Sequence, residues 1–316
     1  MTRTQTQPVS VAELSPELNQ LLAAAGQIIL GKEEVLKLAL SCILADGHLL
    51  VEDLPGVGKT TLAHTLARLT GLAFHRLQFT SDLLPADIVG TAIFDRDTQR
   101  FRPHFGPIFT NLLLADEINR ASPRAQSALL EAMEERQVTL EGETHPLPIP
   151  FVVIATQNPR DQVGTYPLPE SQLDRFLMKI SLGYPSAAAE RQLLQGQDRR
   201  TLLNALPPVL DAPRLRQLQT HAEGVHVAAP LLDYVQRLLA HSRASGHVVH
   251  GLSPRAGLAL LRAAKAWALL SQRRHCVPDD LQAVLPSVIA HRLQPRDASV
   301  MPDDLAQQLI EAVPIP

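Results

Sequence analysis

The segment that joins the first apolar strand to the helix after it constrains the fold most. Residues 53–61 read Asp-Leu-Pro-Gly-Val-Gly-Lys-Thr-Thr, between a strand predicted at His48–Glu52 and a helix predicted at Lys59–Thr70. The spacing matches the phosphate-binding loop G-x-x-x-x-G-K-[ST], except that Asp53 replaces the first glycine. Glycine lets backbone N–H groups approach phosphate oxygens, and the helix N-terminus adds its dipole. The residues predicted to bind a nucleotide here are Pro55, Gly56, Val57, Gly58, Lys59, Thr60 and Thr61.

A pair of carboxylates ends a second apolar run, which predicts a strand at Ile108–Asp116. Ligands of parallel sheets gather at the carboxyl ends of strands, so Asp116 is expected to bind both the nucleotide and Mg²⁺. The predicted metal ligands are Thr60 and Asp116, and Glu117 is expected to orient the attacking water. A solvated Asp-Glu turn is the alternative, and the preceding phosphate-binding loop disfavours it.

The wider pattern predicts an α/β fold. Continuous apolar strands separated by helices indicate a parallel sheet with helices on both faces, as in P-loop nucleotide hydrolases. Two insertions, at Thr91–Phe105 and Arg136–Pro148, are predicted to be β-hairpins. The other predicted strands are Phe74–Phe79, Phe151–Thr156 and Phe176–Leu182.

The chain of 316 residues is long enough for two domains. Gly183-Tyr184-Pro185 is predicted to mark the boundary, because every later periodic segment is helical. We expect residues 1–183 to hold N-terminal helices and the nucleotide-binding core, and residues 184–316 to form a helical lid. The predicted lid helices are Ser186–Gln197, Pro213–Ala222, Pro230–His241, Pro254–Leu270, Pro278–Leu285 and Pro302–Ala312.

Composition excludes several other classes of protein. The net charge of −3 carries no electrostatic footprint for nucleic acid. Cys42 and Cys276 lie among apolar neighbours, which is typical of buried free thiols, and no Cys/His spacing suggests zinc. No apolar run is long enough for a membrane span, so we expect a cytoplasmic protein.

Taken together, the motifs resemble those of the MoxR family of AAA+ ATPases, and the likeness covers nearly the whole chain. It rests on Leu50–Thr61 and on the runs around Asp116-Glu117-Ile118-Asn119-Arg120-Ala121 and Gln172-Leu173-Asp174-Arg175-Phe176. Further segments carry it: Gln78-Phe79-Thr80, residues 82–88, Gly106-Pro107-Ile108-Phe109, residues 126–134, residues 155–159, residues 164–170 and Ser253-Pro254-Arg255-Ala256.

The resemblance implies roles for three more residues. Asn158 corresponds to sensor 1, which helps to position the lytic water; the alternative is a turn Asn before Pro159. Arg175 corresponds to the arginine finger that faces the ATP of the next subunit, or is a surface Arg paired with Asp174 or Glu170. Arg255 corresponds to sensor 2, which reaches the γ-phosphate from the lid, or is a solvated first-turn Arg. With Glu117, these are the predicted catalytic residues.

The family also implies an activity and partners. We expect ATP and Mg²⁺ as ligands, a homo-oligomeric ring of six subunits, and chaperone-like remodelling of a protein client. A partner with a von Willebrand factor A domain would be a separate protein. The hairpins would line the pore and contact the client, or would be decoration. Three alternatives stay open: a nucleotide-gated binding scaffold, a P-loop kinase, and the motor subunit of a magnesium-chelatase-like complex.

Overall fold

The computed structural model describes residues 11–158, 164–196, 198–297 and 299–315. A parallel sheet lies at its centre, with the strand order β2-β5-β8-β1-β9. The predicted α/β core is therefore confirmed. The strands are β1 (Leu49–Glu52), β2 (Phe74–Gln78), β5 (Leu112–Asp116), β8 (Val152–Gln157) and β9 (Met178–Ile180).

Apolar side chains cover both faces of this sheet. In β1, Leu49 and Val51 join the hydrophobic core on one face and Leu50 joins the core on the other. Alternation of this kind along the apolar run Leu49–Val51 is what a strand buried on both faces requires. Helices α1 (Val11–Ile28), α2 (Glu33–Leu44) and α3 (Lys59–Leu69) cover the first face, and α5 (Pro123–Glu135) covers the second.

The start of α5 follows the prediction, and the start of β5 does not. The Ser122 side chain accepts a hydrogen bond from the Ala125 amide at 3.4 Å, and Pro123 is the first helical residue. Strand β5 begins only at Leu112, so the strand predicted at Ile108–Asp116 was too long. The physical reason is that the Ile108 amide donates to the Ile88 carbonyl at 3.2 Å, outside the sheet ladder.

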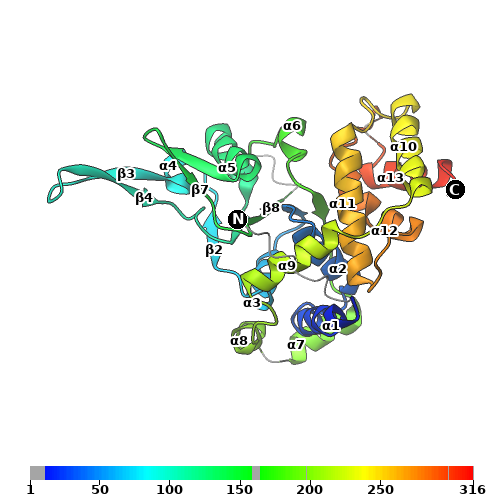
Figure 1. The fold of residues 1–316 in the computed structure, drawn as a ribbon, viewed down its shortest axis with the longest axis horizontal. Helices are drawn as coiled ribbons and strands as arrows, with labels where there is room; N and C mark the ends of the chain where they lie inside the picture. The colour runs from blue at the N-terminus through cyan, green and yellow to red at the C-terminus, as the bar shows by residue number, and fades with distance from the viewer. Residues whose placement is uncertain (1–10, 159–163, 197, 298, 316) are drawn as a thin grey trace, which may run out of the picture.

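Both insertions form the predicted hairpins. The longer one pairs β3 (Gly90–Asp95) with β4 (Arg100–Phe105) and projects far from the core (Figure 1). The shorter one pairs β6 (Gln137–Leu140) with β7 (Glu143–Pro146). The longer hairpin exposes large apolar side chains, which are Ile93, Phe94, Phe101 and Phe105. The short helix α4 (Pro85–Val89), which the prediction lacked, leads into it.

The C-terminal part of the described chain is helical, as predicted. Helix α7 (Ala187–Gln195) is followed by α8 (Arg199–Ala205), which was not predicted and contacts α1 and α3. The remaining helices are α9 (Ala212–Glu223), α10 (Ala229–Ala244), α11 (Pro254–Leu270), α12 (Pro278–Ile289) and α13 (Pro302–Ala312). Of these, α10–α13 lie together beside the core in Figure 1, and α9 packs against α2 and α11.

Candidate active site

Several polar residues singled out in the sequence meet at the carboxyl edge of the sheet. The phosphate-binding loop follows β1, Asp116 is the last residue of β5, and Asn158 follows β8 directly. Since these strands are neighbours and parallel, their ends lie side by side. Pro159, which stands in the alternative interpretation of Asn158, lies outside the described residues.

The loop itself has the backbone that phosphate binding requires. Gly56 and Gly58 have φ angles of 83° and 100°, which side chains other than glycine rarely adopt. Helix α3 begins at Lys59, so its first N–H groups point toward the loop. The Lys59 ammonium folds back over the loop onto the carbonyls of Asp53 and, at 3.3 Å, Gln157. Neutral carbonyls hold the lysine in place, and a phosphate would be the stronger partner.

Asp53, the departure from the glycine motif, has a structural role. One carboxylate oxygen accepts from the Leu54 amide at 2.8 Å. The other accepts from the Ser181 hydroxyl at 2.9 Å and from the Gly183 amide at 2.6 Å. Burial alone would raise the pKa of Asp53, but these hydrogen bonds outweigh it, so the pKa lies below its ordinary value. The side chain ties the phosphate-binding loop to the segment that leaves β9.

Asp116 lies where a hydrated metal ion could reach it. Its Oδ2 atom is 3.4 Å from the Thr60 hydroxyl, and its Oδ1 atom accepts from the Thr156 hydroxyl at 2.5 Å. Hard oxygen donors this close suit Mg²⁺, so the two residues fit the ion. The Arg76 guanidinium also pairs with Asp116 at 2.8 Å, and its cation would share the carboxylate with the metal.

Glu117 is held at a strained position beside Asp116. Its φ angle of 57° is in the left-handed region, and its amide donates to the Thr156 hydroxyl at 2.9 Å. Its carboxylate accepts from the Gln78 amide at 2.6 Å and pairs with Arg120 at 3.2 Å. Two side-chain partners and a fixed backbone set the direction of the carboxylate.

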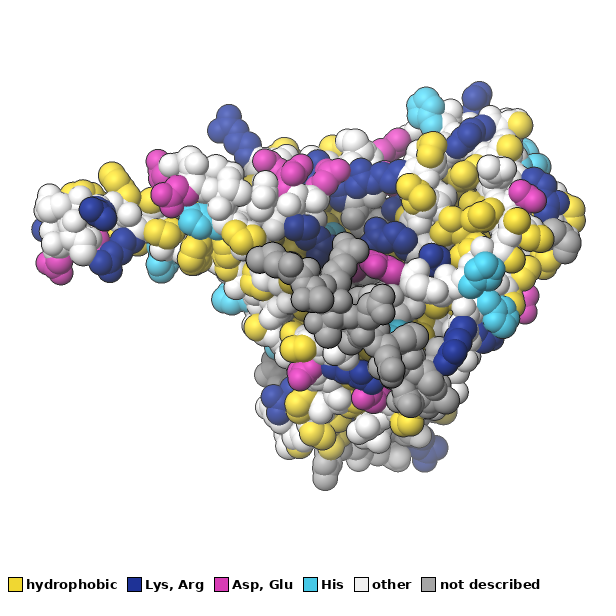
Figure 2. Space-filling model, viewed as in Figure 1, with side chains coloured by type: hydrophobic (Ala, Val, Ile, Leu, Met, Phe, Trp, Pro, Cys, Tyr) yellow, Lys and Arg dark blue, Asp and Glu magenta, His cyan; other side chains and the backbone are white. Residues whose placement is uncertain are grey.

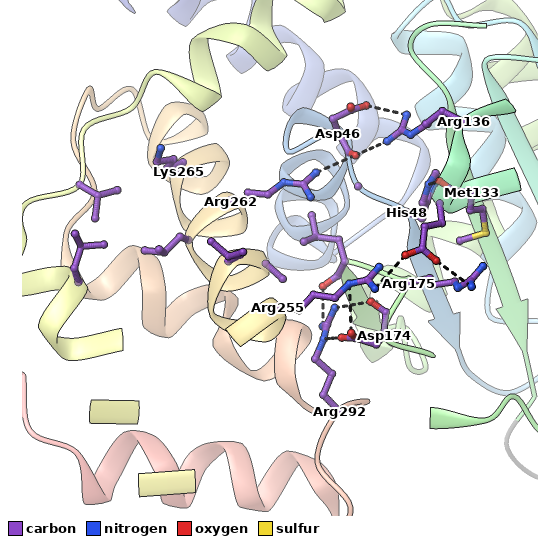
Figure 3. Close-up of a pocket in the computed structure, with 18 residues that line it drawn as sticks. Asp46, His48, Met133, Arg136, Asp174, Arg175, Arg255, Arg262, Lys265 and Arg292 are labelled. Carbon is purple, nitrogen blue, oxygen red and sulfur yellow. Dashed lines mark hydrogen bonds and ion pairs between the residues drawn. The ribbon is translucent and has the colours of Figure 1, made fainter. Parts of the chain in front are cut away.

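Arg175 and Arg255 lie at the other edge of the sheet. Arg175 precedes β9, and β9 pairs in parallel with β1, so this residue lies at the amino edge, away from the loop that follows β1. The two edges are separated by the length of a strand, roughly 10 Å for four residues. Arg255, in the first turn of α11, lies beside Arg175 (Figure 3). The structure thus groups the two predicted arginines with each other and away from the phosphate-binding loop of their own chain.

These arginines line a cavity of about 550 Å³ between core and lid. Figure 2 shows the basic side chains that gather where the lid helices meet the core. Arg175 pairs with Glu134 at 2.9 Å, and Arg255 pairs with Glu134 at 3.3 Å and with Asp174 at 3.4 Å. Asp174 also accepts from Arg292 at 2.6 Å. The alternative in which Arg175 pairs with Asp174 or Glu170 is therefore wrong about the partner, which is Glu134 from the end of α5.

Arg292 anchors the lid to this edge. Its side chain is 6% exposed and donates to the carbonyls of Phe176 and Leu177 at 2.8 and 3.2 Å. Burial lowers its pKa, while the Asp174 carboxylate acts in the opposite direction. The lid is thus fixed to the residues just before β9 by a buried, hydrogen-bonded ion pair.

Gln78, Thr156, Arg76, Glu134 and Arg292 are described here but were given no role from the sequence. Gln78 and Thr156 were included in the resemblance but had no assigned role, although each is polar and stands at the carboxyl end of a strand. That placement was a usable signal. Glu134 also lies in a resembling segment, but Glu134, Arg76 and Arg292 gave no comparable signal, because their contacts depend on tertiary packing.

The fold and the residues at the strand ends define a P-loop protein with an AAA+ core and a lid. Residues 48–178 match the model described as "ATPase family associated with various cellular activities (AAA)", and residues 240–312 match an AAA lid domain. A solved structure from Cytophaga hutchinsonii, described as a candidate ATPase, is similar with a TM-score of 0.87 and 32% identity over 97% of both chains.

Two relatives narrow the class to a family. Chaperone MoxR1 of Mycobacterium tuberculosis is 40% identical over 95% of this chain and 82% of its own. Protein MoxR of Methylorubrum extorquens is 32% identical over 91% and 92%. Protein YeaC of Bacillus subtilis, which has no described function, is 41% identical over 96% of both chains. The chain belongs to the MoxR family of AAA+ ATPases.

The described residues also bear on two other kinds of site, a membrane span and a metal cluster. None of the helices within residues 11–315 that the structure describes has the length and apolar character that crossing a membrane requires. Within the same part of the chain, no three His, Cys, Asp or Glu side chains are grouped as a metal site. Cys42 and Cys276 are buried free thiols, as predicted, and burial raises both pKa values to about 12.

Proposed function

We propose that this protein hydrolyses ATP in a homo-oligomeric ring, expected to be hexameric, in which each site is completed by the next copy. The observation that carries the proposal is the position of the residues on opposite edges of one sheet. Lys59, Thr60, Asp116 and Glu117 belong to one edge, and Arg175 and Arg255 to the other. Arginines at the amino edge can serve a nucleotide only if a second copy presents its carboxyl edge to them.

At the carboxyl edge, each side chain has a distinct task. Lys59 and the amides at the start of α3 would bind the β- and γ-phosphates. Thr60 and Asp116 would hold Mg²⁺, which neutralises phosphate charge when bound. Glu117 would orient the attacking water, with Asn158 from the adjacent strand end assisting. Phosphoryl transfer needs such positioning and charge neutralisation more than covalent chemistry.

At the amino edge, the arginines would supply the remaining positive charge. A guanidinium added from a neighbouring molecule is worth about 10³–10⁵ in rate. The Arg175 side chain is 26% exposed and Arg255 is 52% exposed, so neither is sealed from an approaching phosphate. Turnover by an isolated copy should therefore be slow, and assembly should raise it.

Mixing variants tests where the arginines act. Glu117→Gln and Arg175→Ala should each bind ATP and turn over slowly. A mixture should regain activity, because Arg175 of one variant can complete the intact Glu117 site of the other. Lys59→Ala, which loses nucleotide binding, is the control. Mixed with Glu117→Gln it should stay inactive, because every chain then carries a defective phosphate or water position. Mixed with Arg175→Ala it should restore activity, because it still supplies Arg175.

A second mixture, of Arg255→Ala with Glu117→Gln, shows whether Arg255 acts on the ATP of its own chain or of the next copy. If Arg255 serves the neighbouring site, Arg255→Ala mixed with Glu117→Gln should regain activity. If it serves the site of its own chain, the mixture should stay inactive. Full turnover by a monomeric form of the wild-type protein would reject the shared site altogether.

Remodelling of a protein client is the second element of the proposal. It is supported by the projecting hairpin, whose Phe94 and Phe101 rings are both exposed and lie 5.3 Å apart between centroids. Exposed apolar side chains that lie together mark sites of contact with other proteins. Phe101→Ser should keep the basal ATPase rate and weaken binding of a permanently unfolded, carboxymethylated protein. Equal binding by the variant would contradict this assignment.

A binding scaffold with incidental hydrolysis would behave differently. In that case Glu117→Gln should support client binding and release as well as the wild type. In the proposed ATPase, the variant should bind ATP and client but fail to release the client. A partner with a von Willebrand factor A domain remains part of the family expectation, and co-purification with the Glu117→Gln protein tests it.

A further inference from the structure

Glu134 joins the two arginines on which the shared site depends. It lies in the last turn of α5, at the amino edge of the sheet. Its Oε2 atom is 2.9 Å from Nη2 of Arg175, and its Oε1 atom is 3.3 Å from Nη1 of Arg255. A single carboxylate therefore binds one guanidinium from the core and one from the lid with its two oxygens.

The arrangement imitates what a terminal phosphate would do. Two guanidinium groups repel each other unless an anion lies between them, and a carboxylate offers two oxygens in a geometry that Arg recognises. A γ-phosphate offers three oxygens and more charge. We propose that Glu134 occupies, in a free copy, the place that the neighbouring copy's γ-phosphate takes on assembly. This inference rests on the proposed function.

The exposed fractions of the side chains show which ion pair a phosphate could replace. The Glu134 side chain is 38% exposed, so its two pairs are screened by water and each contributes little. The pair of Asp174 with Arg292 is different, because the Arg292 side chain is only 6% exposed. Asp174 also contacts Arg255 at 3.4 Å, so Arg255 keeps one partner when Glu134 is displaced. Phosphate can thus replace Glu134 while the buried pair holds the lid in place.

The expected consequence is that a higher protein concentration is needed before the copies assemble. While Glu134 neutralises both arginines, an incoming nucleotide must compete with it. Once the copies are assembled, Glu134 is a negative charge close to a triphosphate and opposes the contact. Removal of the Glu134 charge should therefore favour assembly for two reasons. The arginines would be free to bind the phosphate, and the carboxylate would no longer repel the triphosphate.

The test is ATP turnover per chain, measured against protein concentration in wild type and Glu134→Gln. The concentration at half-maximal turnover should fall about threefold to tenfold, as expected for the loss of two exposed pairs. The plateau rate should stay within about twofold, since Glu134 does not act in the assembled site. Glu131→Gln is the matched control, because Glu131 is exposed on the same helix, one turn earlier, and forms no ion pair within the described part of the chain.

Glu134→Asp, which keeps the charge, should stay closer to the wild-type midpoint than Glu134→Gln. A midpoint that is unchanged or raised in Glu134→Gln, or a plateau lowered by more than about threefold, would overturn the inference. An unchanged or raised midpoint would show that Glu134 does not compete with the phosphate. A lowered plateau would show that Glu134 positions the arginines in the active site. Wild-type turnover that is independent of protein concentration would instead reject the shared site, which is a separate failure.

Discussion

Restoring the glycine that the phosphate-binding motif expects should damage this protein. Asp53 is not among the described residues with a positive φ angle, so its backbone does not need glycine. Its buried carboxylate accepts hydrogen bonds from Leu54, Ser181 and Gly183, at 2.6–2.9 Å. Asp53→Gly would remove all three bonds and add freedom to the unfolded chain. The substitution therefore has a defined cost and no gain in the folded state.

The expected loss of stability depends on the donors that lose their acceptor in Asp53→Gly. Each bond to a charged group contributes about 1.5–3 kcal/mol, but Ser181 is exposed and water can replace its partner. We expect the free energy of unfolding to fall by about 2–4 kcal/mol in Asp53→Gly, including about 0.5–1 kcal/mol for chain entropy. Asp53→Asn keeps the size and one good acceptor, so the loss should be about half as large.

Urea denaturation, followed by circular dichroism, measures the change. The pKa of Asp53 is lowered in the folded state, so the ionised carboxylate contributes stability above the unfolded pKa of about 3.9. That contribution is lost as the pH falls through the folded pKa, and the gap between wild type and Asp53→Asn should narrow below about pH 4. An Asp53→Gly protein as stable as the wild type at pH 7 would refute the reasoning.

Three further predictions concern other parts of the core. Gln78→Ala should lower kcat about tenfold, with nucleotide affinity unchanged, because Glu117 loses the amide that directs it; equal kcat in steady-state assays would contradict this. Burial lowers the pKa of His48 to about 3 and also lowers that of His291, so only the unfolded chain gains these protons below pH 6.5. Stability should fall on acidification by about 1.4 kcal/mol per pH unit for each histidine, and His48→Asn should reduce that slope in denaturation curves. Ser122→Ala should reduce the free energy of unfolding by about 1 kcal/mol through the lost cap of α5, and no change in the urea midpoint would count against the cap.

The helices and strands that were predicted well are those set by residues close together in the sequence. Helix α11 starts at Pro254 and ends at Leu270, as predicted, because a Ser-Pro start and a 3.6-residue apolar period are local signals. The parallel sheet was predictable because its central strands β1, β5 and β8 are mostly apolar and buried. Strand β5 was predicted too long because Ile108 is as apolar as a strand residue, yet its amide bonds to another segment. Helix α8 was missed because it is short and its apolar face is small.

The active-site residues also differ in how far the sequence places them. The position of Arg175 at the edge opposite the loop was contained in the sequence, since the loop follows one strand and Arg175 precedes a parallel one. Order along the chain and parallel pairing are enough to place both. The position of Arg255 was not contained there, because Glu134 is 121 residues away and the two meet only through the angle at which α11 lies against the end of α5. No local pattern encodes that angle; it results from the packing of the whole lid and from the buried Arg292 contacts that fix it. Sequence can therefore place a residue on an edge of the sheet, whereas its partner across a domain interface has to be observed.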